Sequence, residues 1–217
     1  MRRLAPYLAL AALVGCGSSA PATVAGNPSS PASTTSSIAV PTSRAHGSHH
    51  GSVLVVGDSL VVGADSAGLT RLLQADGWTV EIDATEGRST RTGIVDVADR
   101  TSVPSLVLVE MGTNPSSNIA GFADEIRQML DDLEAKGAKR VLWVTPHYRD
   151  DDRYDDKDKA IMAAAAADPT LVVADWHAIA AAHPEWMRSD GLHYTDLGYL
   201  HLAAFLSDQI DANDPNP

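Results

Sequence analysis

Five short apolar runs, separated by segments of helical periodicity, constrain the fold of this chain more than any other feature. The runs span 53–56, 79–83, 106–110, 141–145 and 171–174. Most of them are continuous stretches of Val, Leu and Ile, which is typical of strands buried on both faces. Strands that alternate with helices predict an α/β fold, with a five-stranded parallel sheet covered by helices on both sides.

The segments between the runs carry helix signals. One helix is expected to present its apolar face at Leu69, Leu72 and Leu73. Asn118 can cap a second helix, whose apolar stripe is Phe122, Ile126, Met129, Leu130 and Leu133. A last helix, beginning near Thr195, is expected to bury Leu197, Leu200, Ala204 and Leu206.

The first residues have the three parts of an export signal. Arg2 and Arg3 precede an apolar run over 8–14, which is too short to span a bilayer, and small residues follow. The sequence LVGC, ending at Cys16, resembles the bacterial lipobox, in which the cysteine is lipidated and becomes the first mature residue. We therefore predict a lipoprotein signal peptide over 1–15 and a lipid anchor at the outer face of the bacterial cell membrane. An ordinary cleaved signal peptide is the alternative.

Residues 16–50 are dominated by Ser, Thr, Pro, Ala and Gly, with few large apolar side chains to offset the entropy of ordering. They predict a flexible tether, and residues 51–217 a single domain. The tether histidines His46, His49 and His50 are interpreted as a solvated cluster rather than a metal site. Cys16 is the only cysteine, so no intramolecular disulfide can form.

The charge of the chain excludes one class of partner. The first 50 residues hold three arginines and no acidic residue, which leaves 13 basic and 28 acidic residues and a net charge of −15 in the rest. Nucleic-acid binding needs a basic footprint, so we expect no nucleic-acid partner.

Three residues, one directly after the first predicted strand and two in a loop well beyond the last, offer the parts of a nucleophilic site. Ser59 comes after the first strand, where a turn into a helix can expose its hydroxyl. His193 can remove the serine proton, and Asp190, three residues earlier, can accept the other imidazole proton on a tight loop. The backbone N–H groups of Ser59 and Gly87 and the amide of Asn114 are the expected oxyanion donors.

The order of these residues resembles that of the SGNH or GDSL hydrolases. The resemblance covers about residues 52–210 and rests on GDSL over 57–60, Gly87, GTN over 112–114 and DGLH over 190–193. Gly93 is a nearby competitor of Gly87. The resemblance implies a three-layer α/β/α sandwich of flavodoxin-like type. It also implies ester cleavage or acyl transfer without a metal or other cofactor.

The segment from Asp175 to Thr195 resembles the extracytoplasmic domain of bacterial peptidoglycan and polysaccharide O-acetyltransferases. We therefore expect a secreted serine esterase that removes short acyl groups, acetyl above all, from small molecules or cell-envelope glycans through an acyl-enzyme. An O-acetyltransferase with a membrane partner as acetyl donor is the first alternative. A catalytically inactive glycan-binding module is the second.

The remaining residues divide between core and surface. Trp176, Trp186 and Met187 are interpreted either as pocket residues or as core residues. Four other histidines show no ligand-like spacing with carboxylates and are expected to be structural or exposed: His147, His177, His183 and His201. The acidic stretch over 150–156 lacks a calcium-loop pattern, so no metal site is predicted.

Overall fold

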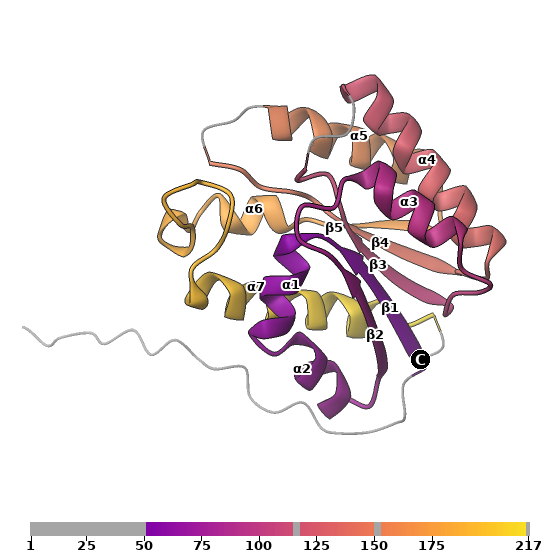
Figure 1. Cartoon of the computed structure of the whole chain (residues 1–217), viewed down its shortest axis with the longest axis horizontal. Coiled ribbons are helices and arrows are strands. Elements are labelled where there is room, and N and C mark those ends of the chain that lie inside the picture. Colours follow the sequence, from indigo (N-terminus) through magenta and orange to yellow (C-terminus); the bar gives the residue numbers. More distant parts are fainter. Residues whose placement is uncertain (1–50, 115–117, 150–152, 216–217) are drawn as a thin grey trace, which may run out of the picture. The chain divides into compact units, whose positions relative to one another are not determined.

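A five-stranded parallel sheet forms the centre of the domain (Figure 1). The structure is a computed structural model and describes residues 51–114, 118–149 and 153–215. The strands are β1 (Ser52–Gly57), β2 (Thr79–Ala84), β3 (Leu106–Glu110), β4 (Arg140–Val144) and β5 (Leu171–Ala174). They lie in the order β2-β1-β3-β4-β5, and every pair is parallel. The five predicted strands are confirmed, with ends shifted by a residue at most.

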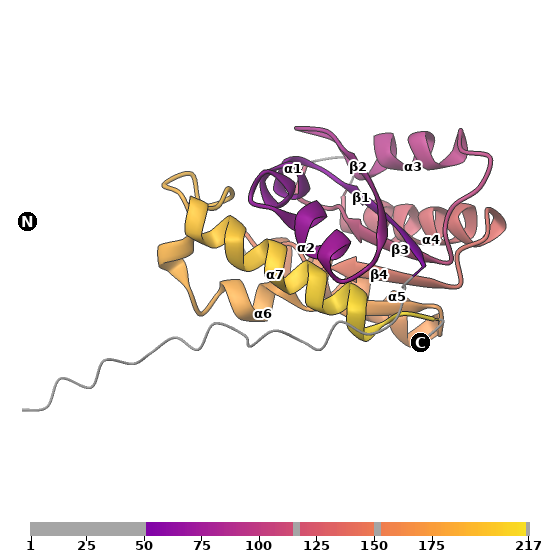
Figure 2. The same cartoon turned by 90° about the horizontal axis from the view of Figure 1, so that it is seen from below.

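Helices cover both faces of this sheet, as Figure 2 shows. The helical elements are α1 (Ser59–Ser66), α2 (Leu69–Ala75), α3 (Thr90–Ala98), α4 (Ile119–Ala135), α5 (Arg153–Ala167), α6 (Trp176–Ala180), the 3₁₀ turn η1 (Pro184–Trp186) and α7 (Asp196–Ala212). Buried residues of α1, α2, α6 and α7 form one core cluster, and those of α3, α4 and α5 form the other. The predicted α/β fold, with its three layers, is confirmed.

The central strand β1 separates the two clusters. Val53 and Val55 pack with α1, α2 and α7, whereas Leu54 and Val56 pack with α3 and α4. Successive side chains of a strand point to opposite faces, so a run that is apolar at every position serves both cores. All four side chains are fully buried.

Two predicted helix faces are partly wrong. Leu72 of α2 is 37% exposed, although Leu69 and Leu73 are buried. In α7, Leu197 and Leu200 are each 52% exposed. Leu206 is buried as predicted, and the other buried apolar residues of the helix are Tyr199, Leu202, Ala203 and Ile210. Both sets have helical spacing, and the packing of Tyr199 against α1 decides which set faces the sheet, because its ring occupies the space that a side chain at Gly63 would fill.

The topology creates a crevice at one edge of the sheet. After β1 the chain passes to α1 on one face, and after β3 it passes to α4 on the other, although β1 and β3 are neighbours. Such a switch point leaves an opening at the carboxyl ends of the two strands, where α/β proteins bind ligands. Ser59 and Asn114 follow these two strand ends.

The described residues contain no helix that combines the length and the apolar character needed to cross a membrane. The signal peptide, Cys16 and the tether lie outside the described residues and stay predictions.

Candidate active site

Ser59 is the first residue of α1, directly beyond β1. Asp58 caps this helix, because its Oδ1 accepts a hydrogen bond of 2.9 Å from the backbone N–H of Leu60. The turn is tight: a Cβ atom on Gly57 would lie 2.2 Å from a methyl group of Val61. Glycine and aspartate at these positions therefore hold the serine hydroxyl at the carboxyl edge of the sheet.

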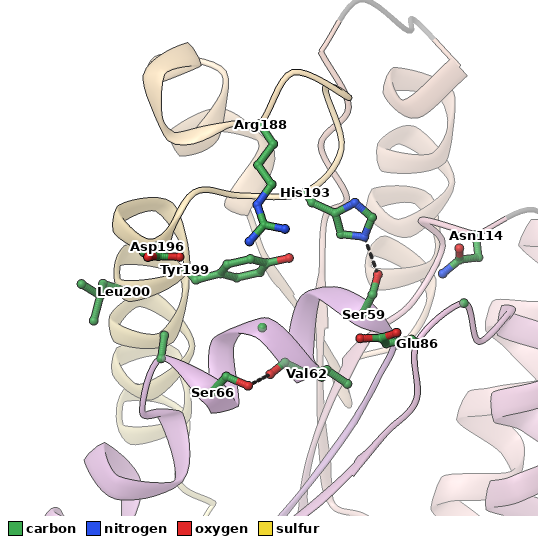
Figure 3. Close-up of a pocket in the computed structure, with 13 residues that line it drawn as sticks. Ser59, Val62, Ser66, Glu86, Asn114, Arg188, His193, Asp196, Tyr199 and Leu200 are labelled. Carbon is green, nitrogen blue, oxygen red and sulfur yellow. Dashed lines mark hydrogen bonds between the residues drawn. The ribbon is translucent and has the colours of Figure 1, made fainter.

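The structure brings Ser59, His193 and Asp190 together. Ser59 Oγ lies 3.1 Å from His193 Nε2 (Figure 3). His193 Nδ1 lies 3.0 Å from Asp190 Oδ2. The two ring nitrogens thus have different partners: Nδ1–H can donate to the carboxylate while Nε2 accepts the serine hydroxyl proton.

The loop that carries Asp190 and His193 is held by its own backbone. Arg188 N–H donates to His193 O at 2.7 Å, and Gly191 N–H donates to Arg188 O at 3.0 Å. Gly191 has a φ of +72°, a conformation that only glycine adopts without strain. The loop closes just before Thr195, which caps α7. These backbone contacts therefore help to fix the position of His193.

Asp190 carries a negative charge throughout the ordinary pH range. Its Oδ1 accepts the backbone N–H groups of Leu192 at 2.9 Å and His193 at 3.0 Å. The bond from Leu192, followed by the contact with the His193 ring, lowers the pKa of Asp190 to about 2. The carboxylate can therefore orient the ring and stabilise an imidazolium that forms next to it.

Two of the three predicted oxyanion donors are available as the structure stands. The backbone N–H groups of Ser59 and Gly87 donate to no other residue in the described part of the chain. Gly87, with a φ of +73°, lines the cavity beside Ser59. Its competitor Gly93 lies inside α3, where a Cβ atom would meet Met111 at 3.1 Å. The structure therefore favours Gly87.

The third donor, Asn114, is already engaged. Its Nδ2 donates to Asp58 Oδ2 at 2.9 Å and to Arg88 O at 3.2 Å. To bind an oxyanion, the amide would have to give up its hydrogen bond to the Arg88 carbonyl. This is the longer of its two hydrogen bonds. The bond to Asp58 would meanwhile keep the amide in place.

Arg88 is a residue that the sequence analysis missed. Its guanidinium is buried, donates to Asp83 O at 2.7 Å and forms an ion pair with Asp96 at 3.1 Å. The same side chain pairs with the Asp83 carboxylate. These contacts anchor the turn after β2, and with it Gly87 and the carbonyl that Asn114 contacts. A basic residue next to Gly87 is the only signal that the sequence offers.

A second missed residue is Glu110, the last residue of β3, which is 1% exposed. Its Oε1 accepts a hydrogen bond of 3.4 Å from the Thr113 hydroxyl, and its buried Oε2 has no hydrogen-bond partner among the described residues. Burial, and then the charge of Asp58, raises the pKa of Glu110 well above its usual range. This shift favours the protonated form of Glu110, whose O–H can donate to the neighbouring Asp58 carboxylate.

This pair lies directly behind the candidate site, because Asp58 contacts both the turn at Ser59 and the amide of Asn114. Burial also raises the pKa of Asp58. Asp58 nevertheless accepts hydrogen bonds from the Leu60 N–H and the Asn114 amide, which favour its charged form. Glu110 thus acts as a positioning residue for Asp58 and, through it, for Asn114. A charged residue that ends an otherwise apolar strand is the signal that marks it in the sequence.

We expect Glu110→Gln, which keeps a neutral donor, to retain the folded structure and to change how stability depends on pH. In the wild type, unfolding releases a proton from Glu110 at any pH between the ordinary glutamate pKa and the raised one. The free energy of unfolding therefore falls as pH rises, by up to about 1.4 kcal/mol per pH unit. Glu110→Gln removes this slope, whereas Glu110→Leu lowers stability by about 1–3 kcal/mol because Asp58 loses a donor.

Urea unfolding at a series of pH values from acid to alkaline measures this effect. A slope that Glu110→Gln retains in full would show that Glu110 is ionised in the folded protein.

A cavity of about 800 Å³ opens beside the Ser59 hydroxyl. Figure 3 shows the side chains that line it, which come from α1, from the turns after β2 and β3, and from the loop and helix that follow η1. Its charged groups are Glu86, Arg188 and Asp196. The Arg188 guanidinium lies 5.8 Å from the centroid of the Tyr199 ring. The cavity is large enough for a sugar-sized ligand and offers it polar, charged and aromatic contacts.

Trp176, Trp186 and Met187 are core residues, at 2%, 7% and 6% exposure, and none of them lines this cavity. The core interpretation of these residues is confirmed. The ring of Trp186 is stacked between those of His183 and His201, at centroid distances of 3.8 and 4.0 Å.

His177 departs from the expectation that it has no carboxylate in ligand-like placement. Its Nδ1 contacts Asp158, and its Nε2 lies 3.9 Å from Asp155 Oδ1. The sequence separation of about twenty residues hides this proximity, which arises because α5 and α6 begin next to each other. The residues at 150–152 of the acidic stretch lie outside the described residues.

No protein-family model matches the chain, and no curated protein sequence matches it.

Solved structures do match. The C-terminal catalytic domain of peptidoglycan O-acetyltransferase A from Streptococcus pneumoniae is 24% identical, with a TM-score of 0.64 over 79% of this chain and 98% of that one. A family 3 carbohydrate esterase from Talaromyces cellulolyticus is 17% identical, with a TM-score of 0.61 over 74% of this chain and 96% of that one.

The esterase EstA from a Pseudoalteromonas species is 16% identical, with a TM-score of 0.61 over 74% of this chain and 97% of that one. At these identities the likeness establishes the fold. The described part of the chain therefore shares the α/β fold of these O-acetyltransferase and esterase structures, which is the fold that its motifs predicted.

Proposed function

We propose that the protein is a serine esterase that cleaves short acyl esters, with acetyl esters of a cell-envelope glycan as the preferred substrate class. The observation that carries this proposal is the hydrogen-bonded series from Ser59 through His193 to Asp190, which opens into the cavity of about 800 Å³. The structural neighbours with esterase and O-acetyltransferase activity support the same reaction class.

The chemistry follows from the placement of each group. Ser59 Oγ attacks the ester carbonyl while His193 Nε2 takes its proton, and the oxygen that becomes negative accepts hydrogen bonds from the Ser59 and Gly87 N–H groups. The imidazolium next protonates the departing alcohol, which leaves an acyl group on Ser59. Water then attacks this acyl-enzyme, gives its proton to His193 and releases the carboxylic acid and free serine.

A glycan is the substrate class that fits the surroundings of the serine. The cavity is partly open and its lining is mixed. Glu86, Arg188 and Asp196 can hydrogen bond with the hydroxyls of a sugar, and apolar side chains such as Val62 and Leu200 can contact a short acyl group. The acidic charge of the domain argues against a polyanionic substrate. Export and lipidation of Cys16 would place the enzyme at the cell envelope, with the 16–50 segment as a tether. No cofactor has a role in this reaction.

An O-acetyltransferase is the second candidate, favoured by the likeness to the pneumococcal O-acetyltransferase domain. The first half of the reaction is the same, but a sugar hydroxyl replaces water as the second acceptor. A membrane protein would then supply the acetyl donor.

One experiment distinguishes the two reactions. The full chain is incubated with a chromogenic acetyl ester, with and without a glycan oligosaccharide, and free acetate and acetylated sugar are measured by mass spectrometry. An esterase releases acetate at the same rate in both samples, whereas a transferase forms acetylated sugar at the expense of acetate. Absence of turnover with every acyl ester in a panel of chain lengths would leave the inactive glycan-binding module as the better account.

A further inference from the structure

A second group of ionisable side chains lies at the beginnings of α5 and α6. We call Asp155, Asp158 and His177 the α5–α6 cluster. One ligand atom from each lies within 4.8 Å of those from the other two. None of the three lines the cavity of Ser59, so the cluster has no part in the proposed hydrolysis.

Buried polar atoms without hydrogen-bond partners gather at this cluster. Asp158 is 7% exposed, and its Oδ1 has no partner among the described residues. His177 Nδ1 contacts the other oxygen of Asp158 but forms no hydrogen bond. His147 is 8% exposed, its Nδ1 also lacks a partner in the described part of the chain, and its ring centroid lies 4.7 Å from that of His177. Native proteins rarely leave such atoms unpaired.

An ion pair between His177 and Asp158 is the simplest explanation, but it is incomplete. It satisfies one oxygen of Asp158 and leaves Oδ1 without a partner. It also assigns no role to the nearby Asp155, whose carboxylate adds negative charge to the same place. A cation held jointly by the three side chains would satisfy these groups together.

We propose that the α5–α6 cluster binds a divalent transition-metal ion, and that zinc fits it best. An imidazole nitrogen with two carboxylate oxygens is a common zinc ligand set, whereas calcium and magnesium prefer oxygen ligands alone. Ligand atoms of a tetrahedral zinc ion lie about 3.5 Å apart. The three donor atoms, which lie within 4.8 Å of one another, therefore have to adjust their separations on binding, which a rotation of the exposed Asp155 side chain can provide. His147 is the candidate fourth ligand.

The surroundings hold His177 in place for this purpose. Its backbone N–H donates to Thr145 Oγ1 at 2.9 Å, and that hydroxyl donates to Asp175 Oδ1 at 3.0 Å. Asp175 in turn caps α6. A bound ion would tie the first turns of α5 and α6 together beyond the ends of β4 and β5, which is a structural rather than a catalytic role.

The test measures zinc binding to the full chain by isothermal titration calorimetry. His46, His49 and His50 are first replaced by glutamine, because tether histidines could bind zinc themselves. In this background we expect one equivalent of zinc to bind and to raise the melting temperature, since a ligand of the folded state stabilises it. Asp158→Asn and His177→Gln should each weaken binding by at least about tenfold.

His183→Gln is the matched control, because His183 also contacts a carboxylate, Glu185, but in an exposed pair. We expect it to leave zinc affinity unchanged. Absence of saturable zinc binding would overturn the proposal, as would binding that His177→Gln leaves intact or that His183→Gln weakens equally. Far-ultraviolet circular dichroism without metal shows whether each variant is folded. His177→Gln keeps the test valid if Asp158→Asn does not fold.

Discussion

Replacing Ser59 by alanine is expected to lower kcat/KM for an acetyl ester by about 10⁴- to 10⁶-fold. The variant loses the only atom that can form the acyl-enzyme in the proposed reaction, while the oxyanion donors and the cavity remain. Any residual rate would come from these groups acting on water. Because Ser59 Oγ contacts His193 alone among the described side chains, we expect little change in stability. Steady-state kinetics and urea unfolding of the same preparations measure both effects.

Ser66→Ala is the matched control for this prediction. Ser66 lines the same cavity, and its hydroxyl donates to Val62 O within α1 at 2.9 Å, away from His193. We expect it to keep kcat/KM within a few-fold of the wild type. Acetyl-ester turnover that Ser59→Ala leaves unchanged would exclude the acyl-enzyme.

The second large effect is expected from Asp190→Asn, at about 10²- to 10⁴-fold in kcat/KM. Asparagine can present its amide N–H to His193 Nδ1, which favours the tautomer whose Nε2 already carries a proton. That nitrogen then cannot accept the proton of Ser59. The Asp190 side chain is 49% exposed, so water can reach His193 Nδ1 and accept its proton in place of the lost carboxylate. The lower end of the range corresponds to that case. Kinetics with a chromogenic acetyl ester measure the loss.

Asp196→Asn is the control for the lost charge, since Asp196 lines the same cavity and contacts no histidine in the described structure. Equal losses in the two variants would show that charge alone, rather than the contact with His193, supports the reaction.

The contribution of Asp190 to folding stability also changes with pH in a defined direction. Because its pKa is lowered to about 2, ionised Asp190 stabilises the fold above the ordinary aspartate pKa, and this contribution is lost as pH falls toward 2.

The strands were predictable because burial on both faces demands apolar side chains at every position, as in Val53 to Val56. Helix caps were predictable because a capping side chain bonds to the backbone only a few residues further along the chain. Asn118 does cap α4, because its side chain accepts a hydrogen bond from the N–H of Gly121, only three residues away. Both signals are local in the chain.

Helix orientation was less predictable. In α7 two apolar stripes have equally good spacing, and contacts with residues of α1, such as Gly63, select the stripe of Tyr199 over that of Leu200. The exposed Leu200 instead lines the cavity. No periodicity within the helix could show this, because the deciding partner lies more than a hundred residues earlier in the chain.

The amino-acid sequence by itself determined the α/β class and the number of strands, and it singled out the candidate serine, histidine and aspartate, since these follow from local patterns and from motif order. Only the tertiary structure decided that Asn114 is held by Asp58, that the buried Glu110, with its raised pKa, lies behind them, and that His177 meets two carboxylates of α5. The physical reason is that protonation states and side-chain partners depend on burial and on distances across the fold, which neighbouring residues in the chain do not encode.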